Sequence, residues 1–415
     1  MPATWPTEVL PHLTPDHHRL WHEADAFAAE HIAPRVPRME AHPLKVEREA
    51  AQLMADLGWF GVTIPSQYEG MAAGHVAKTV LIHRIGTVSA AVAAILQASL
   101  IPAGAVHLWG TAEQKTTWLP LAAAGRVLLS IAVTEPQAGG HIGGIATTAE
   151  QDGDGWIITG NKIHIGNSHL AGCHVVLART APPGVCASRA LTAFLVEHDR
   201  KGLTVQPHRP GLGLRGFTKG QLSLDRVRIP AANVLGEIGQ GLFVAQSASI
   251  LYGRPNLTAV SLGIHEALVT TTVNWLTTRK RYDGHLSDLP VARDRLGAMQ
   301  NRLQTARGVA YQAVHLLDLG LACDAQLISA KTTGHELAAD SARDAMELHG
   351  AHALDGDYPL QRLFRDIPYT YAPAGTGEFQ RIHLARTTLH ETEVEWSQRM
   401  ASETAGTAAP DPTPA

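Results

Sequence analysis

Residues 131–167, IAVTEPQAGGHIGGIATTAEQDGDGWIITGNKIHIGN, combine a glycine-rich turn with side chains that can move a proton. Two β-rich runs enclose the turn, and Gly139 and Gly140 would let a ligand approach the backbone closely because they carry no side chain. His141 in the turn and His164 in the second run are candidates for general acid–base chemistry, since imidazole titrates near neutral pH. The alternatives are a solvated turn residue at His141 and a packing group at His164.

A second glycine pattern, Gly211-x-Gly213-x-x-Gly216, spells a dinucleotide-binding motif without its usual context. That motif requires a strand before it and a helix after it. Here Pro210 precedes the pattern and a predicted strand follows it. We therefore expect these glycines to form turns.

The composition is that of a globular protein. The 415 residues suffice for two or three domains, with 45% hydrophobic and 17% charged residues. A formal net charge of −4, without a stripe of Lys or Arg, gives no reason to expect a nucleic-acid partner. The three cysteines show no metal or redox spacing, and the histidines are scattered, so we expect reduced thiols and no metal site. No signal peptide is recognised at the N-terminus, and the apolar run at 88–100 is too short to span a bilayer, so we expect a cytoplasmic protein without a membrane partner.

Periodicity divides the chain into a helical, a β-rich and a second helical part. Apolar residues at three- and four-residue steps predict helices over 14–57 and 73–108, and Thr111 with Gln114 predicts a capping box for a helix to about residue 124. β-branched runs predict short strands at Leu128–Val133, Trp156–Ile158, His174–Ala178, Leu191–Val196, Leu203–Val205 and Gln221–Ile229. Amphipathic segments predict a four-helix bundle over 241–281, 288–318, 321–350 and 376–400.

We therefore expect an α+β protein with an N-terminal helical domain at 1–126, a β-barrel-like domain at 127–237 and a C-terminal four-helix bundle at 238–400. Pro255 falls inside the first bundle segment and should kink it or offset its start. The Pro-containing end, 401–415, is expected to be disordered.

Four segments resemble the acyl-CoA dehydrogenase family and together represent nearly the whole chain. They are GWFGVTIPSQYEGM at 58–71, TEPQAGG through DGDGWIITGNKIHIGN at 134–167, LDRVRIPAANVLGEIGQG at 224–241, and YPLQRLFRD with GTGEFQRIHLAR at 358–386. The resemblance implies the same order of helical, β and helical domains. It also implies a homodimer or homotetramer that associates through residues 241–400.

The resemblance further implies an FAD site whose frame is kept. Positions that match flavin contacts of the family are Thr134, Gly139, Gly350 and Thr376. Arg279 matches the arginine that reaches the pyrophosphate from a neighbouring subunit. Beside it, Tyr282 replaces a Phe, and Arg281 replaces a Gln and would add positive charge near phosphates.

Several polar contacts of that site are changed. Gly140 replaces the Ser at the pyrophosphate, and Gly166 replaces the Thr whose hydroxyl meets the reactive flavin nitrogen. His164 replaces the Trp on the ring face, and Glu347 replaces a Gln near the cofactor. An acid facing phosphates is unfavourable unless Arg279 or Arg281 pairs with it. The sequence therefore predicts FAD that is held weakly or has been lost.

Both positions that carry the catalytic Glu in the family lack it here. They correspond to Ala374, before Gly375-Thr376, and to Gly253, before Arg254, which the resemblance places at the substrate. Neither residue can accept a proton, so ordinary α,β-dehydrogenation of a fatty acyl-CoA is not expected. The resemblance leaves His164, His141 and Tyr252 as candidates for acid–base chemistry.

Two hypotheses follow. The first is a flavin oxidoreductase of specialised metabolism that needs no Glu base, with a β-keto acid or an oxygenase reaction as examples. The second is a flavin-free cyclase, isomerase or lyase with histidine as the acid–base group. The substrate is expected to be a small molecule or a thioester, on CoA, on an acyl carrier protein or on neither.

Overall fold

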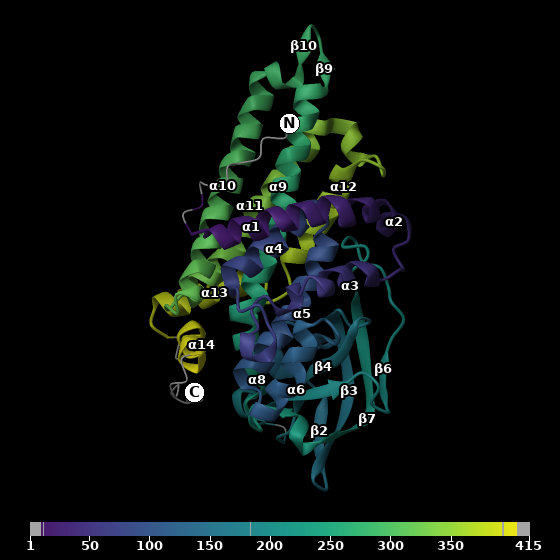
Figure 1. Ribbon diagram of the computed structural model, residues 1–415, viewed down its shortest axis with the longest axis vertical. Helices are drawn as coiled ribbons and strands as arrows, with labels where there is room; N and C mark the ends of the chain where they lie inside the picture. Colours follow the sequence, from purple (N-terminus) through teal and green to yellow (C-terminus); the bar gives the residue numbers. More distant parts are fainter. Residues whose placement is uncertain (1–9, 11, 183, 392–393, 405–415) are drawn as a thin grey trace.

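The first part of the chain is helical. The computed structural model describes residues 10, 12–182, 184–391 and 394–404 (Figure 1). The N-terminal helices are α1 (Pro15–Phe27), α2 (Val36–Ala41), α3 (Arg48–Asp56), α4 (Gly74–Val88), α5 (Ala90–Trp109) and α6 (Ala112–Ala123). The capping box predicted at α6 is confirmed, because Gln114 N donates to Thr111 Oγ1 and Thr111 N donates to Gln114 Oε1, both at 3.1 Å.

Helix α5 lies at the centre of this part. By length and composition alone, its 20 residues are long and apolar enough to cross a membrane. From the sequence, only the run at 88–100 was considered, and it is too short to do so. However, 83% of the most apolar window of α5 is buried inside the protein, as in a core helix. Its neighbours are both helices and the sheet, so α5 connects the three parts of the molecule.

The middle part is a sheet of eight strands with the order β6-β7-β3-β2-β4-β5-β8, and β1 pairs with β4 in parallel. The strands are β1 (Leu128–Ala132), β2 (Thr148–Asp152), β3 (Gly155–Gly166), β4 (Ala171–Arg179), β5 (Leu191–Glu197), β6 (Leu203–Val205), β7 (Lys219–Pro230) and β8 (Val234–Leu235). All six predicted strands are present, and β2 and β8 were not predicted. Gly211, Gly213 and Gly216 lie in the loop before β7, as expected of turn glycines.

The last part is helical again. Its elements are α8 (Gly241–Ala248), the π-helical turn η8 (Ser249–Gly253), α9 (Arg254–Thr278), the hairpin strands β9 (Lys280–Arg281) and β10 (Gly284–His285), α10 (Pro290–Asp318), α11 (Asp324–His349), α12 (Pro359–Asp366), α13 (Gly377–Thr388) and α14 (Trp396–Thr404). Pro255 is the second residue of α9 and directly follows the π-helical turn η8, so the helical run from Gly241 is irregular there but its start is not offset. Helices α4 and α9 approach closely at Gly86 and Gly263, where a Cβ on Gly263 would come within 2.6 Å of the Gly86 Cα.

The predicted fourth bundle helix, 376–400, is divided. Helix α13 ends at Thr388, and His390 adopts a left-handed conformation with φ +58°, which no helix interior accommodates. Helix α14 then begins at Trp396 and continues to Thr404, so residues 401–404 are helical where disorder was expected. Residues 405–415 of the predicted tail lie outside the described part of the chain.

Candidate functional site

The two positions at which a carboxylate base was sought meet in space. Gly253 ends η8, and Ala374 lies in the loop before α13. A Cβ built on Gly253 would lie 3.3 Å from the Ala374 Cβ and 3.8 Å from Cδ1 of Ile101 on α5. We call this place the Gly253–Ala374 site. Neither of its two defining residues carries a group that can accept a proton.

The loop that carries Ala374 is held in a strained conformation. Ala374 has φ +57°, a left-handed conformation that costs a non-glycine residue roughly 1 kcal/mol or more. Gln380 Nε2 donates to the Ala374 carbonyl at 2.6 Å. Lys331 Nζ, from α11, donates to the carbonyls of Tyr371 and Gly375. Neither Lys331 nor Gln380 was singled out from the sequence, because nothing in SAKTTG or GEFQR indicates which carbonyls they contact.

Tyr252, directly before Gly253, is packed between α4 and α5. A Cβ on Gly104 of α5 would come within 2.2 Å of its ring, and Lys78 Nζ of α4 lies 4.9 Å from the ring centroid. Burial raises the pKa of the Tyr252 phenol, which makes the phenolate that a general base requires less accessible. The acid–base role of Tyr252 stays a prediction.

The end of β3 approaches the Gly253–Ala374 site along α5. A Cβ on Gly166 would lie 3.3 Å from the Ala98 Cβ and 3.0 Å from Cζ of Phe217. Ala98 and Ile101 are three residues apart on one helix, which corresponds to a rise of about 4.5 Å. Asn167 fixes this approach, because its Nδ2 donates to the Ile95 carbonyl at 2.8 Å and to Ser99 Oγ at 2.9 Å. The fold thus brings Gly166, Gly253 and Ala374 to one face of α5.

His164 lies two residues before Gly166, with an exposed side chain and φ +59°. Partial burial lowers its pKa, and the charge of Lys219 lowers it further. A lowered pKa keeps the imidazole neutral at neutral pH, so it can accept a proton. The structure leaves His164 available for acid–base chemistry, although no described contact aims it at Ala374.

The glycine turn is held by a buried carboxylate. Glu135 accepts hydrogen bonds from Lys162 Nζ at 2.7 Å, from the Ala146 amide at 2.7 Å and from the Thr147 amide at 3.1 Å. These contacts account for a structural role of Glu135. The carbonyl of Thr134 is likewise engaged, since it accepts from the Ile163 amide at 2.9 Å.

Within this turn, a Cβ on Gly139 or Gly140 would meet nothing within 4 Å, so the backbone is open to a ligand. His141 instead folds back on its own turn, where a Cβ on Gly144 would come within 2.8 Å of its ring. The structure therefore does not bring His141 to the Gly253–Ala374 site.

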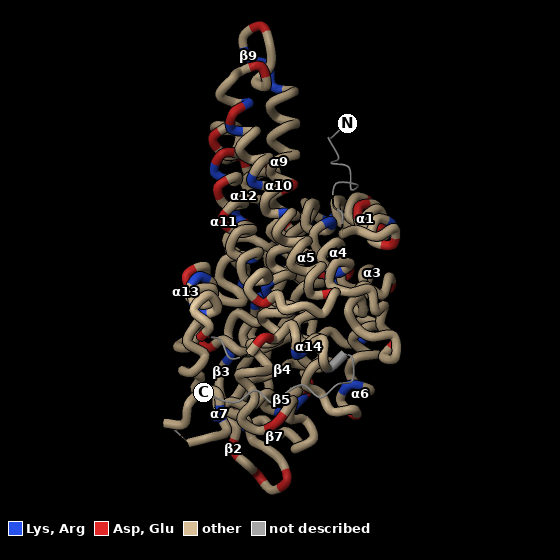
Figure 2. The backbone as a smooth tube through the Cα atoms, turned by 90° about the vertical axis from the view of Figure 1, so that its left-hand side faces the viewer, with Lys and Arg blue, Asp and Glu red and all other residues tan. Residues whose placement is uncertain are grey.

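Arg279, Arg281 and Tyr282 lie at the opposite end of the molecule from the glycine turn. The β9–β10 hairpin forms the tip of the column made by α9, α10 and α11, whereas the sheet forms the other end (Figures 1 and 2). The Arg279 guanidinium lies 5.2 Å from the Trp275 ring, and that of Arg281 lies 5.2 Å from the Tyr282 ring. Tyr282 is 83% exposed. Within one copy of the chain these cations cannot reach the turn that they were expected to assist.

Glu347 does not form the ion pair that would make an acid beside phosphates favourable. It forms an ion pair with Arg295 of α10, not with Arg279 or Arg281. Gly350 follows α11 with φ +59°, and a Cβ there would meet nothing within 4 Å. Thr376 is the N-cap residue of α13. Glu347 and Gly350 thus lie at the C-terminal end of α11, whereas Thr376 lies at the start of α13, which adjoins the middle of α11.

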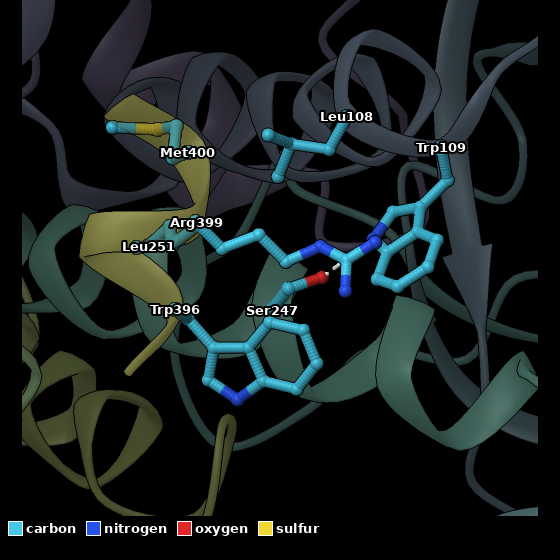
Figure 3. A pocket seen from close by; sticks show the side chains of 7 residues that line it. All are labelled: Leu108, Trp109, Ser247, Leu251, Trp396, Arg399 and Met400. Atoms are coloured by element: carbon cyan, nitrogen blue, oxygen red, sulfur yellow. Dashed lines mark hydrogen bonds between the residues drawn. The ribbon is translucent and has the colours of Figure 1, made fainter. Parts of the chain in front are cut away.

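A pocket lies farther along α5 from the Gly253–Ala374 site (Figure 3). It is lined by Leu108, Trp109, Ser247, Leu251, Trp396, Arg399 and Met400. Leu108 follows Ile101 by seven residues, a rise of about 10 Å. Trp109 Nε1 donates to Ser247 Oγ at 2.8 Å, and the Arg399 guanidinium of α14 lies 4.5 Å from the Trp109 ring. Helix α14 therefore forms one wall of the pocket.

The described residues fit a flavin dinucleotide at some positions and not at others. The open glycines of the turn and of position 350 fit a close approach by phosphates or a ring, and the exposed arginines of the hairpin fit phosphates of a second copy. Beside Gly166, however, Phe217 occupies the space where a hydroxyl-bearing side chain would stand. Among the residues that the structure describes, no group of three His, Cys, Asp or Glu could hold a metal ion.

Comparisons with known proteins match the chain along almost its whole length. The models of the acyl-CoA dehydrogenase N-terminal, middle and C-terminal domains match residues 14–126, 130–227 and 239–389. An acyl-CoA dehydrogenase of Bacillus subtilis is 32% identical over 370 residues, 88% of this chain and 96% of that protein.

Solved structures agree with this match. The butyryl-CoA dehydrogenase of Megasphaera elsdenii superposes with a TM-score of 0.87 at 25% identity, over 91% of this chain and 99% of that one. The prolyl acyl carrier protein oxidase AnaB superposes with a TM-score of 0.84 at 25% identity, over the same shares.

Proposed function

Because the chain belongs to the acyl-CoA dehydrogenase family, we propose that it is a flavin-dependent oxidoreductase that acts without a carboxylate base. The observation that carries the proposal is the Gly253–Ala374 site, where both alternative base positions meet and neither bears an acid. The substrate is an acyl thioester or a β-keto acid rather than a plain fatty acyl-CoA. A role in specialised metabolism is part of the proposal.

The frame of the glycine turn supports FAD as the cofactor. The backbone at Gly139 and Gly140 would face the pyrophosphate, and Arg279 and Arg281 of a second copy would neutralise its charge. The ring would lie between Gly166 and the Gly253–Ala374 site. Bound there, FAD supplies the capacity to accept a hydride or to react with oxygen. With glycine at 140 and 166 two side-chain hydrogen bonds are missing, so binding is weaker than in a site that keeps both.

A β-keto acid fits a site without a base. When its carboxylate leaves as CO₂, the carbon–carbon bond breaks and the electron pair stays on the α carbon as an enolate. No protein group has to remove a proton in this step. His164, kept neutral by its lowered pKa, is the residue best suited to exchange a proton afterwards.

The proposed assembly is a homodimer or homotetramer, because one copy cannot bring Arg279 to its own glycine turn (Figure 2). The likeness to a prolyl acyl carrier protein oxidase supports a carrier-bound thioester as one form of the substrate. Light scattering at micromolar concentration tests the assembly. A monomer would remove the proposed role of Arg279.

A second candidate is a flavin-free enzyme in which His164 performs non-redox acid–base chemistry. Phe217 beside Gly166 favours it, because this ring fills space next to the expected flavin position. A Phe217→Ser substitution distinguishes the two candidates. It should strengthen FAD binding under the first proposal and have no effect on FAD under the second.

The visible absorption spectrum of protein purified with added FAD and then dialysed tests the proposed function. A retained flavin band, lost in Arg279→Ala and unchanged in Arg189→Ala, supports it. Arg189 is a surface arginine of the sheet part and serves as the control. Absence of a flavin band at every FAD concentration would favour the flavin-free candidate.

A further inference from the structure

Arg254 is a buried cation, two of whose guanidinium nitrogens have no hydrogen-bond partner among the described residues. It is the first residue of α9, directly after Gly253, and its side chain is only 3% exposed. The two nitrogens are Nε and Nη1, and both are buried. Unpaired buried charge is among the most costly features of a folded protein, so such a group calls for an explanation.

The described surroundings of Arg254 contain basic side chains and one nearby acid. Among the described residues, Asp324, at the start of α11, is the carboxylate whose charge acts on Arg254, and it already accepts the amides of Trp396 at 2.8 Å and Ser397 at 2.9 Å. Burial, and then the charge of Arg254, lowers the pKa of Lys331 of α11 and of His383 of α13. Burial lowers the pKa of Arg254 to about 10, only partly offset by Asp324, so the guanidinium stays protonated at neutral pH.

Arg254 also adjoins the Gly253–Ala374 site. It follows Gly253 in the chain, and Lys331, which responds to its charge, donates to the carbonyl of Gly375 next to Ala374. A glutamate at either 253 or 374 would place a carboxylate in this neighbourhood. In this sequence neither position 253 nor position 374 is an acid, whereas Arg254 is present.

We propose that Arg254 binds a carboxylate that the substrate itself carries on its acyl part. A carboxylate accepts charge-assisted hydrogen bonds from a guanidinium, and the buried Nε and Nη1 atoms of Arg254 are two donors without a partner among the described residues. This inference rests on the proposed function for the location of the substrate. It adds the substrate class, an acyl compound with a free carboxylate, and makes Arg254 a specificity-determining residue.

Two ligands of equal carbon number provide the test. Succinyl-CoA and butyryl-CoA both carry a four-carbon acyl group, but only the first has a free carboxylate. Isothermal titration of the full chain should show at least tenfold tighter binding of succinyl-CoA. Arg254→Met should abolish the preference, and Arg254→Lys should retain part of it, because the ammonium keeps the charge without the fixed donor directions of the guanidinium.

Arg302→Met is the matched control. Arg302 is a part-buried arginine of α10 that pairs with Asp344, away from Gly253 and Ala374. This variant should keep the preference of the wild type. Equal binding of the two thioesters by the wild type, or a preference that survives in Arg254→Met, would overturn the proposal.

A second pair of ligands removes the dependence on CoA. Propionate should raise the thermal midpoint of the wild type more than propionamide at equal concentration, and the difference should vanish in Arg254→Met. Neither assay requires bound flavin or turnover. Carboxylate binding can therefore be observed even if the protein is not a flavin oxidoreductase, and a flavin oxidoreductase can fail to bind the carboxylate. No stabilisation by propionate together with no preference between the thioesters would refute a carboxylate site at Arg254.

Discussion

Two places along α9 hold buried arginine side chains, and they differ in the presence of a carboxylate. Glu266 of α9 accepts hydrogen bonds from Arg84 Nη1 at 2.7 Å and from Arg307 Nη2 at 2.6 Å. It is also contacted by His83 Nε2 at 3.1 Å. Arg254, twelve residues earlier and about 18 Å along the helix, has no such acceptor.

Glu266 and its partners His83, Arg84 and Arg307 form a group with a structural role. Burial alone would raise the pKa of Glu266, but the hydrogen bond from His83 and the charges of Arg84 and Arg307 hold it well below its usual range. Burial lowers the pKa of His83 to about 4, so this ring is neutral and donates one hydrogen bond. The group connects α4, α9 and α10. The contrast indicates that Arg254 is retained for a partner that is not part of the chain.

Replacement of Glu266 should have the largest effect on the free energy of unfolding. Glu266→Gln leaves Arg307 without its carboxylate and leaves Arg84 with Asp25 alone, so we expect a loss of about 3 kcal/mol in the free energy of unfolding. Urea denaturation at neutral pH measures it. Because the folded pKa of Glu266 is depressed, its contribution is present above about pH 4.5 and disappears as the pH falls toward the folded pKa. A loss below about 0.5 kcal/mol would mean that the pairing is weak.

Replacement of the arginines should give changes of opposite sign. Arg307→Met breaks a pair and should lower the free energy of unfolding by about 2 kcal/mol, whereas Arg254→Met removes an unpaired charge and should leave it unchanged or raise it by about 1 kcal/mol. The same urea series measures both variants. If Arg254→Met destabilises the protein as much as Arg307→Met does, Arg254 has a structural partner and the comparison fails.

A carboxylate introduced beside Arg254 should behave like the missing one. Ala374→Glu should be more stable than the size-matched Ala374→Gln by on the order of 1 kcal/mol at neutral pH. The Arg254 charge would lower the folded pKa of the new Glu, so the advantage should disappear as the pH falls below about 4. In the Arg254→Met background the Glu and Gln variants should have equal melting temperatures. A difference that persists there would place the new acid outside the reach of Arg254.

The smallest expected effect concerns the lysine beside the site. Burial, and then the charge of Arg254, lowers the pKa of Lys331 to about 7. Between about pH 7 and pH 9 the unfolded chain binds this proton and the folded chain does not, so the contribution of Lys331 to stability rises with pH. Arg254→Met should raise the folded pKa and flatten this rise, as measured by thermal unfolding across the same pH range. An unchanged slope of stability against pH would show that the charge of Arg254 does not affect the pKa of Lys331.

Much of the fold was predictable from local patterns. Three features each depend on residues close in sequence: the order of helical, β and helical parts, the capping box at Thr111, and the helix irregularity next to Pro255. The break between α13 and α14 was missed because the amphipathic pattern continues through His390, whose left-handed backbone carries no sequence signal. Strand β2 was missed because its residues, TAEQD, have low β propensity and are paired only through β3.

The site was less predictable, because it depends on contacts between distant segments. The loss of the acid at 253 and 374 can be read from the chain, but their approach within 3.3 Å cannot. The packing of the Tyr252 ring against Gly104 cannot be read from the chain either. The pairing of Glu347 with Arg295, the ring of Phe217 beside Gly166 and the unpaired state of Arg254 likewise required the packed structure.

Anaerobic mixing of the FAD-loaded protein with octanoyl-CoA tests most directly the claim that this flavoprotein acts without a carboxylate base. A positioned base contributes roughly 10² to 10⁴ in rate, so its loss should prevent removal of the α proton. We predict that the visible flavin band stays unchanged over many minutes, while Ala374→Glu gives slow bleaching. Rapid bleaching of the wild-type flavin would contradict the account and would direct attention to His164 as the base.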